Sequence, residues 1–438
     1  MTICIGVRRE DKSLWERRVP VTPADAKQLQ LEHGIQVIVQ PSASRAFSSE
    51  EFESAGAIMR DDLSTCPVVL GIKEMPEEAF RPGGTYVFFA HVIKGQEYNM
   101  PMLRRIMDLG CTLIDYERVV DEQNRRLIFF GWHAGVAGAI DTLWALGQRL
   151  AWEGIDNPFR LLQLTHTYHD LAEARAALAE VGRRIEGEGV AEQVTPLIVG
   201  IAGYGNVSRG VQEIMNILPV IQIEPEEVDA VAGDPKASRH HIYVVVFKEW
   251  HMVEAIAPGA PFDLQDYYAH PDKYRGAFHQ YLPHLTVLVN AIFWTKAYPR
   301  LVTNATLTGL FGRPEEPRLR VIGDISCDIE GAIQCTVKST PPGDPVYVYN
   351  PVDAAVTDGY EGQGVVIMAV DILPAELPRE ASNYFSHVLR PFIPAIAACD
   401  FSVPFSECNL PSEIRRATIV YKGELTPDYQ QIRQYLGG

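Results

Sequence analysis

The sequence predicts an α/β protein with two doubly wound lobes, and three observations lead to this fold class. Short continuous apolar runs, such as residues 68–72, alternate with amphipathic segments of helical spacing. Strands that are apolar on both faces are typical of a parallel sheet with helices on both sides. A glycine turn at residues 203–205 stands between such a strand and a helix in the middle of the chain. A second set of apolar runs follows the turn and predicts a second sheet, at residues 242–247, 286–290 and 319–323.

The first lobe is expected to open with a strand at residues 2–7 and a helix that begins after Thr22. Thr22 supplies a side-chain cap, Pro23 stands at the first helical position, and Asp25 places a carboxylate in the first turn. Gly34 ends this helix, because glycine readily takes the left-handed conformation of a helix end. The remaining elements of the lobe are predicted, in order, as a strand at 35–39, a helix at 50–57, strands at 68–72 and 86–90, a helix at 102–109 and a strand at 112–114.

The stretch from Thr195 to Gly210 carries the most informative motif of the chain. An apolar strand runs into Gly203-Tyr-Gly205, and apolar residues at helical spacing follow. Glycine backbone can approach a pyrophosphate closely, and the helix N-terminus offers free N–H groups and a partial positive charge. The motif therefore predicts a Rossmann-like dinucleotide cradle, with a tight structural turn in another α/β fold as the alternative. The residues expected to form the cradle are Gly203, Gly205, Asn206, Val207 and Ser208.

A long helix with a regular apolar stripe from Val136 onward leads from the first lobe toward this motif. After the second set of strands, the chain adds a strand at 364–370 and a helix from Pro378. We expect this tail to return to the first lobe. The predicted domains are residues 136–349, and residues 1–135 together with 350–438, with a cleft between them.

Ionisable side chains stand at the carboxyl ends of predicted strands, where ligands bind in open α/β sheets. Arg18 lies in the loop after the first strand, and Lys73, His91 and Asp324 each follow a strand directly. Each alone has an ordinary structural explanation: a surface charge for Arg18, a solvated pair with Glu74 for Lys73, a loop histidine for His91, a turn or cap residue for Asp324. Together they predict one polar cleft, although position alone does not name a reaction.

The charge balance restricts the partners of the chain. The sequence has 39 basic and 56 acidic residues, a formal net charge of −17. Such a charge argues against nucleic acid or an anionic membrane surface as a partner. An anionic substrate would therefore have to be held by locally placed arginines.

Other common site chemistries have no motif in this sequence. The seven cysteines show no C-x-x-C spacing and are expected to be reduced thiols of an intracellular protein. The histidines show no metal-ligand spacing, so we predict no metal, and no G-x-S-x-G or cysteine–histidine signature is present. The N-terminus has no apolar leader and the chain has no run of about 18 apolar residues. We expect a cytoplasmic protein.

Several long motifs resemble one enzyme family. They are Glu16-Arg-Arg-Val-Pro-Val-Thr-Pro, Gly71-Ile-Lys-Glu-Met-Pro, Phe89-Ala-His-Val-Ile-Lys-Gly-Gln-Glu, Phe130-Gly-Trp-His-Ala-Gly-Val-Ala-Gly, Gly203-Tyr-Gly-Asn-Val-Ser-Arg-Gly, Asn290-Ala-Ile-Phe-Trp and Gly323-Asp-Ile-Ser-Cys-Asp-Ile-Glu-Gly. With them, nearly the whole chain resembles the lysine–2-oxoglutarate reductases, that is, the saccharopine dehydrogenases (L-lysine-forming). In animals and plants this is the first half of aminoadipic semialdehyde synthase. More distantly, the chain is similar to alanine dehydrogenase and the nicotinamide nucleotide transhydrogenase domain.

The resemblance implies a reaction and a set of residue roles. The ε-amine of L-lysine would condense with the keto group of 2-oxoglutarate, and reversible hydride reduction of the imine would give saccharopine. By matching motifs, His91 is the candidate acid–base group, and Lys73 is the amine that neutralises charge and tunes it. Arg18 and Arg126 would clamp substrate carboxylates, and Glu74 is assigned to the same substrate site.

The resemblance also implies a nicotinamide cofactor, held by the domain at 136–349, while the other domain holds the substrates. Where the animal pattern has Ser-Arg, this chain has Lys248-Glu249. Lys248 would attract the additional phosphate of NADP, whereas Glu249 would accept hydrogen bonds from the ribose hydroxyls of NAD. The alignment of Lys248 with the animal cation favours NADP, with NAD as the alternative. The remaining implied cofactor residues are Asn290, Ala291 and Asp324, the last of them near the nicotinamide.

Three functions remain open on the sequence alone. The first is a reductase that forms saccharopine. The second is a related opine or amino-acid dehydrogenase that uses another amine or 2-oxo acid. The third is a nucleotide-binding regulator without catalysis, against which the presence of both Lys73 and His91 speaks. The sequence leaves the oligomeric state and the physiological direction undetermined.

Overall fold

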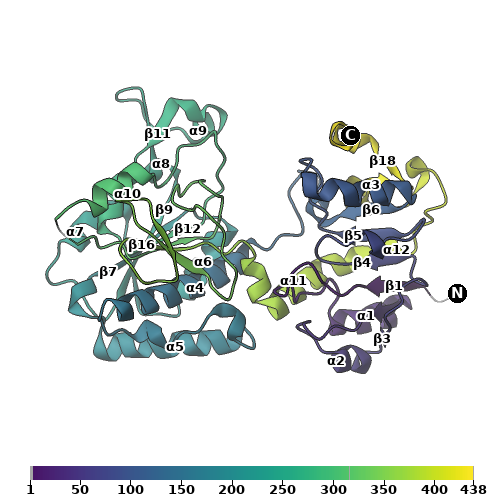
Figure 1. Ribbon diagram of the computed structural model, residues 1–438, viewed down its shortest axis with the longest axis horizontal. Helices are drawn as coiled ribbons and strands as arrows, with labels where there is room; N and C mark the ends of the chain where they lie inside the picture. Colours follow the sequence, from purple (N-terminus) through teal and green to yellow (C-terminus); the bar gives the residue numbers. More distant parts are fainter. Residues whose placement is uncertain (1–2, 315, 438) are drawn as a thin grey trace. The chain divides into compact units, whose positions relative to one another are not determined.

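The structure is a computed structural model that describes residues 3–314 and 316–437 (Figure 1). The chain divides into two compact units, Met1–Phe130 with Pro378–Gly438, and Gly131–Leu377. Each unit has its own sheet with helices around it, so the predicted α/β class is confirmed. The tail from Pro378 belongs to the first unit, as expected. The first strand covers Cys4–Val7 and is shorter than the predicted strand at 2–7. Residue 2 lies outside the described residues.

The sheet of the first unit has the strand order β18-β17-β6-β5-β4-β1-β2-β3. The strands from β6 to β3 run parallel, whereas β17 from the tail pairs antiparallel with both of its neighbours, β6 and β18. The strand bounds are β1 Cys4–Val7, β2 Gln36–Val39, β3 Ile58–Met59, β4 Val68–Leu70, β5 Thr85–Phe88, β6 Thr112–Asp115, β17 Thr418–Tyr421 and β18 Glu424–Leu425. The helices are α1 Pro23–His33, α2 Ser49–Ser54, α3 Met100–Asp108, α11 Pro378–Leu389, α12 Ile393–Ala397, α13 Ser412–Ala417 and α14 Arg433–Leu436.

Local sequence explains the first helix of this unit. The Thr22 hydroxyl accepts a hydrogen bond from the Asp25 N–H at 3.4 Å, and Pro23 occupies the first turn of α1. Gly34 ends the helix with φ of 65°, a left-handed conformation that costs glycine little. The predicted start and end of α1 are therefore confirmed.

The sheet of the second unit has the strand order β15-β14-β16-β13-β12-β7-β9-β8, in which β14 pairs antiparallel with both of its neighbours, β15 and β16. The strand bounds are β7 Leu197–Ala202, β8 Val220–Gln222, β9 Ile242–Phe247, β12 Val287–Asn290, β13 Val321–Asp324, β14 Val346–Tyr349, β15 Val356–Asp358 and β16 Val365–Met368, with a separate hairpin of β10 Val253–Ala255 and β11 Tyr274–Gly276. The helices are α4 Gly131–Trp152, α5 Leu171–Glu188, α6 Asn206–Met215, α7 Val228–Ala232, α8 Glu249–Met252, α9 Leu264–Ala269 and α10 Asn304–Phe311.

The domain boundary near the tail differs from the predicted one. Residues 350–377 fall in the second unit and not with the tail. The physical reason is β16, which pairs with β13 on one side and with β14 on the other, and so lies inside the second sheet. At the other boundary the long helix begins at Gly131, five residues before the predicted start at 136.

The central strand β7 shows why the second unit is doubly wound. All six of its residues are buried. Val199 and Ile201 pack in a core that includes apolar residues of α4, α5 and α6, whereas Ile198 and Ala202 pack in a second core with Leu307 of α10. Because successive side chains alternate between the two faces, a fully apolar strand needs a covered core on each side.

Helices α4 and α6 cross closely at a pair of glycines. A Cβ atom on Gly135 would lie 1.9 Å from the carbonyl oxygen of Val207, and one on Gly210 would lie 2.3 Å from the carbonyl oxygen of Trp132. Both obstacles are backbone atoms, so only glycine fits at either position. The crossing fixes α6, and with it the helix N-terminus that follows the glycine turn.

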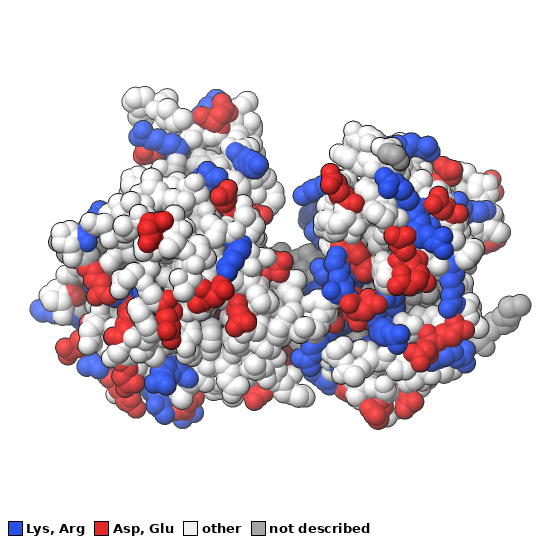
Figure 2. Space-filling view, in the orientation of Figure 1, with Lys and Arg blue, Asp and Glu red and all other residues white. Residues whose placement is uncertain are grey.

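The surface and the helices carry two further findings. On the face drawn in Figure 2, acidic and basic residues are interspersed over both units. None of the helices formed by residues 3–314 and 316–437 has the length and apolarity that a membrane span requires. Within the same residues, no group of three or more His, Cys, Asp or Glu side chains is placed to hold a metal ion. The predicted cytoplasmic location stays a prediction.

Candidate functional site

The first unit gathers polar side chains at the carboxyl ends of β1, β4 and β5. His91 follows β5 and has φ of 48°, a left-handed backbone conformation that residues other than glycine adopt rarely. Its Nδ1 lies 2.8 Å from Oε1 of Glu74, which follows β4. Asn99 donates to the same Glu74 oxygen at 3.3 Å and to the His91 carbonyl at 3.2 Å. The ring of His91 is thereby fixed through Nδ1, and its Nε2 forms no hydrogen bond with any described residue.

Glu74 is held as a carboxylate by two cationic or ionisable neighbours. Lys12 places its ammonium 2.8 Å from the second oxygen of Glu74. Burial alone would raise the pKa of Glu74, but the hydrogen bonds of His91 and Lys12 outweigh it and leave the pKa well below its ordinary value. Through its contact with Nδ1, the Glu74 carboxylate sets the orientation of the His91 ring.

Arg18 is paired with a carboxylate inside the protein. Its Nε lies 2.7 Å from Glu16 Oε1 and its Nη2 lies 2.5 Å from Oε2, and both side chains are buried. Burial opposes the charge of Glu16, yet the contacts of Arg18 hold the pKa of Glu16 below its ordinary value. The guanidinium also lies over the ring of Phe130 at 4.7 Å. Two of its five donors are taken by Glu16, which leaves Nη1 for a ligand.

Lys73 stands in this cluster without an ion pair to any described residue. Burial and then the charge of Arg18 lower the pKa of the Lys73 ammonium. Glu10 fixes the loop that carries Lys73. Its two oxygens accept hydrogen bonds from the N–H groups of Ile72 at 2.7 Å and of Lys73 at 3.0 Å. Burial, with a contribution from Glu16, raises the pKa of Glu10 to about 7. A lysine with a lowered pKa suits proton transfer near neutral pH.

Four of the five residues predicted for catalysis and substrate binding interact with one another or through Glu16. Lys73, Glu74, His91 and Arg18 lie in one cluster. Arg126 is 44% exposed, and its guanidinium lies 3.5 Å from Glu117. Sequence reasoning missed four members of the cluster: Glu10, Lys12, Glu16 and Asn99. Two of them, Glu16 and Lys12, stood close to Arg18 in the sequence, and an acid two residues before a buried arginine was an available signal.

The glycine turn of the second unit borders a pocket of about 380 Å³. Gly203 has φ of 98°, and a Cβ atom there would lie 2.9 Å from the carbonyl oxygen of Ala291. Gly205 directly precedes the first turn of α6, and nothing lies within 4 Å of its Cβ position. The pocket wall includes Gly203, Gly205, Ala291, Glu249 and Tyr268. An open turn before a helix N-terminus is the arrangement that binds a phosphate.

The sheet order places Glu249 beside this turn. The strand next to β7 is β9 and not β8, and the Gly203 N–H donates to the carbonyl of Phe247 at the end of β9. Glu249 Oε1 lies 2.8 Å from the hydroxyl of Tyr268, while its Oε2 is buried without a hydrogen-bond partner among the described residues. Lys248 lies over the ring of Trp250 at 5.2 Å and is not part of the pocket wall.

The remaining predicted cofactor residues have structural partners. Asn290 donates to Asp324 at 2.8 Å, and the Thr336 hydroxyl donates to the other Asp324 oxygen at 2.5 Å. Burial raises the pKa of Asp324 to about 6. These bonds join the carboxyl ends of β12 and β13 to the loop after β13. In α6, Ser208 is fully buried and accepts a bond from Gln212 at 2.9 Å.

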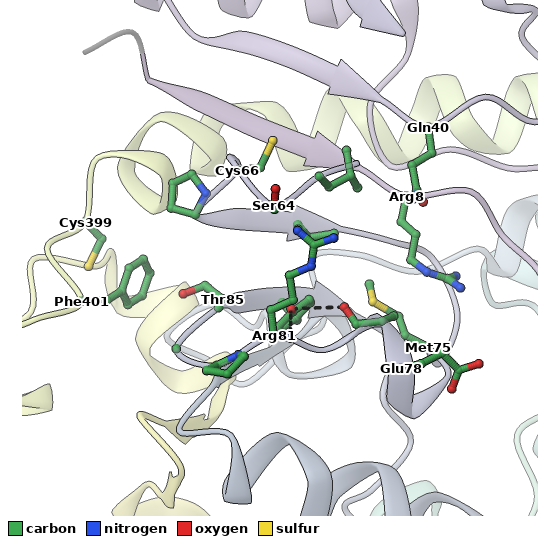
Figure 3. Close-up of a pocket in the computed structure, with 18 of the residues that line it drawn as sticks. Arg8, Gln40, Ser64, Cys66, Met75, Glu78, Arg81, Thr85, Cys399 and Phe401 are labelled. Carbon is green, nitrogen blue, oxygen red and sulfur yellow. Dashed lines mark hydrogen bonds between the residues drawn. The ribbon is translucent and has the colours of Figure 1, made fainter. Parts of the chain in front are cut away.

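A larger cavity of about 510 Å³ lies elsewhere in the first unit (Figure 3). Its wall includes Arg8 and Arg81, but Arg8 is paired with Asp11, and Arg81 is paired with Asp62 at 2.8 Å. Lys73 and His91 are not among its lining residues. Arg8 and Arg81 are each neutralised by an aspartate, and the cavity wall contains neither of the two candidate acid–base residues. The cluster at the strand ends is therefore the better candidate for a catalytic site.

Comparison with known proteins confirms the resemblance drawn from the motifs. Residues 6–137 match the family model of the alanine dehydrogenase/PNT N-terminal domain. Over 98% of its length the chain is 37% identical to alpha-aminoadipic semialdehyde synthase of Arabidopsis thaliana, but it spans only 41% of that protein. A saccharopine dehydrogenase (NAD(+), L-lysine-forming) of Neurospora crassa is 28% identical, with 88% of this chain and 89% of the relative covered.

The fold is also that of a known dehydrogenase. An L-alanine dehydrogenase structure superposes with a TM-score of 0.61 at 17% identity, covering 99% of this chain and 100% of the other. At this identity the likeness bears on the fold alone, and it confirms the Rossmann-like class.

Proposed function

We propose that this chain is a nicotinamide-dependent oxidoreductase that condenses L-lysine with 2-oxoglutarate and reduces the imine to saccharopine. The observation that carries the proposal is the cluster of Lys73, Glu74 and His91 beside Arg18. It supplies an acid–base pair and a carboxylate clamp at strand ends, in a chain whose relatives are named saccharopine dehydrogenase and aminoadipic semialdehyde synthase.

The chemistry requires several proton transfers within one site. When the lysine ε-amine attacks the keto carbon, a C–N bond forms, a proton leaves nitrogen and a proton reaches oxygen. Loss of water from this carbinolamine needs an acid at the oxygen, and the free Nε2 of His91 can supply it. Lys73, with its lowered pKa, can accept the proton that leaves the amine. Glu74 holds the His91 ring in place through Nδ1.

A nicotinamide cofactor fits the second unit. The turn at Gly203 and Gly205 leaves room for a pyrophosphate, and the N-terminus of α6 faces it with free N–H groups. When bound, the cofactor would supply the hydride that reduces the imine. The unpartnered Oε2 of Glu249 in the pocket wall suits the hydroxyls of an unphosphorylated ribose. This geometry favours NAD, whereas the sequence alone favoured NADP.

The cofactor assignment predicts an asymmetry between two neighbouring residues. Glu249→Gln should lower kcat/KM for NADH roughly 10- to 100-fold, because a hydrogen bond to a charged group contributes about 1.5–3 kcal/mol. Lys248→Ala, the matched control, should leave the ratio of NADH to NADPH efficiency unchanged. Steady-state rates with both cofactors decide the point. If the wild-type enzyme preferred NADPH and Lys248→Ala removed that preference, Lys248 would be the ribose-side residue.

The reaction itself is tested by cofactor oxidation with 2-oxoglutarate and a panel of amines. We expect oxidation with L-lysine, and much slower rates with ornithine, ammonia or alanine. Oxidation that prefers another amine or another 2-oxo acid would identify a related opine or amino-acid dehydrogenase. Cofactor binding without oxidation by any pair would identify a regulator.

A further inference from the structure

The loop between β2 and α2 brings Arg45 next to the cluster at the strand ends. The Ala46 N–H donates to the Arg17 carbonyl at 3.0 Å, and Arg17 Nε donates to the Ser44 carbonyl at 3.2 Å. These bonds tie the Arg45 loop to the loop that carries Arg18. In the sheet order β5-β4-β1-β2, the segments that carry His91, Lys73, Arg18 and Arg45 follow four adjacent strands.

Arg45 carries a buried charge that the protein does not pair. Both terminal nitrogens are buried, and neither has a hydrogen-bond acceptor among the described residues. The guanidinium lies over the Phe52 ring at 5.6 Å, and burial lowers its pKa to about 10, so it stays protonated at neutral pH. By contrast, the buried Arg18 and Arg320 each contact a carboxylate. An unpaired buried cation is costly unless an anion completes it.

Glu10 is the carboxyl group whose charge acts on Arg45, but its oxygens already accept hydrogen bonds from the backbone. Its two oxygens accept the N–H groups of Ile72 and Lys73. Arg45 and Arg18 both experience its charge. With the pKa of Glu10 raised to about 7, its carboxyl group is partly protonated at neutral pH. Glu10 therefore does not neutralise Arg45, whose terminal nitrogens have no acceptor among the described residues.

The proposed reaction has more carboxylates than the cluster has clamps. Lysine brings one carboxylate and 2-oxoglutarate brings two, so the imine carries three. Arg18 commits two donors to Glu16, and Arg126 lies 3.5 Å from Glu117. We propose that Arg45 binds a substrate carboxylate and thereby contributes to substrate selection, an inference that rests on the function proposed above.

The position of Arg45 points to the carboxylate farthest from the reacting carbon. Strand β2 lies two places from β4, which corresponds to about 10 Å across a sheet. The lysine carboxylate is separated from the imine nitrogen by its whole side chain, whereas both carboxylates of 2-oxoglutarate stand closer to the reacting carbon. We therefore expect Arg45 to select the amine substrate by its carboxylate.

The test compares Arg45→Met with Arg60→Met. Arg60 follows β3, the neighbouring strand, and its side chain is exposed. Arg45→Met should raise the KM for L-lysine roughly 10- to 100-fold, the range for a lost hydrogen bond to a charged group. Arg60→Met should leave it within about twofold, as is usual for a surface position. Arg45→Lys should recover part of the loss.

Two substrate analogues identify the carboxylate. Cadaverine lacks the lysine carboxylate, and 2-oxopentanoate lacks the distal carboxylate of 2-oxoglutarate. If Arg45 binds the lysine carboxylate, Arg45→Met and the wild type should have similar KM values for cadaverine. If the two proteins differ in KM with cadaverine but not with 2-oxopentanoate, Arg45 binds the distal carboxylate of 2-oxoglutarate. Equal KM values for every substrate in Arg45→Met and Arg60→Met would overturn the proposal and leave Arg45 as a packing residue on Phe52.

A binding measurement keeps this inference separate from the proposed reaction. Calorimetric titration of the wild-type protein with saccharopine, with and without NADH, reports carboxylate binding without turnover, because saccharopine and NADH are both in the reduced state and cannot react with each other. If the wild-type protein neither binds saccharopine nor turns over lysine, the proposed function is refuted. If the wild-type protein binds saccharopine and Arg45→Met binds it equally tightly, only the assignment of Arg45 is refuted. The unfolding temperature of Arg45→Met shows that the variant is correctly folded.

Discussion

Replacing His91 by alanine, or Lys73 by methionine, should lower kcat roughly 10²-fold or more, because a placed acid–base group typically contributes 10²–10⁴ to the rate. The dissociation constant of the nicotinamide cofactor should stay near the wild-type value in both variants, since both residues lie in the first unit and the glycine turn lies in the second. Rapid-mixing kinetics and fluorescence titration of NADH measure the two quantities.

Lys94→Met is the matched control for these variants. Lys94 is exposed and lies three residues after His91, and no ion pair joins it to another described residue. It should retain near wild-type turnover. Normal turnover in both His91→Ala and Lys73→Met would refute the acid–base assignment, because no proton transfer in the cycle would then depend on either group.

Gly135→Ala should destabilise the second unit by about 3 kcal/mol, at the upper end of the cost of overpacking a core. The added carbon would lie 1.9 Å from a backbone oxygen, so α4 and α6 would have to separate. For a unit of this size, such a loss corresponds to an unfolding temperature lowered by roughly 6–12 °C. Cofactor affinity should fall as well, because α6 begins directly after the glycine turn. Differential scanning calorimetry and NADH titration report both effects.

Gly187→Ala provides the comparison for that variant. Gly187 also lies in a helix, α5, and nothing stands within 4 Å of its Cβ position. Alanine is a better helix former than glycine by about 1 kcal/mol, so this variant should be as stable as the wild type or slightly more stable. An unchanged unfolding temperature in Gly135→Ala would show that the two helices do not depend on the close crossing.

Most elements of the fold could be predicted because their sequence signals are local. The cap at Thr22, the left-handed Gly34 and the fully apolar strands each depend on a few adjacent residues. The boundary near residue 350 could not be predicted in this way. Strand β16 belongs to the second sheet because of its pairing partners, and pairing is a property of the folded chain.

The site was predictable only in part for the same reason. Strand ends pointed to Lys73, His91 and Arg18, because a parallel sheet brings its carboxyl ends to one edge. Partnerships between distant residues had no sequence signal. Asp141 and Glu376 illustrate this, since they are two buried carboxyls in mutual contact, 235 positions apart, and burial raises the pKa of each. The orientation of Glu249 into the pocket likewise depends on which strand lies next to β7.

The most direct test of the proposed reaction follows the nitrogen atom of lysine. L-lysine labelled with heavy nitrogen at its ε-amine is incubated with 2-oxoglutarate, NADH and the protein, and the product is identified by mass spectrometry. If lysine condenses with the oxo acid, the label stays in a secondary amine that contains both carbon skeletons, and its amount equals the NADH consumed. NADH oxidation without a labelled secondary amine would contradict the account.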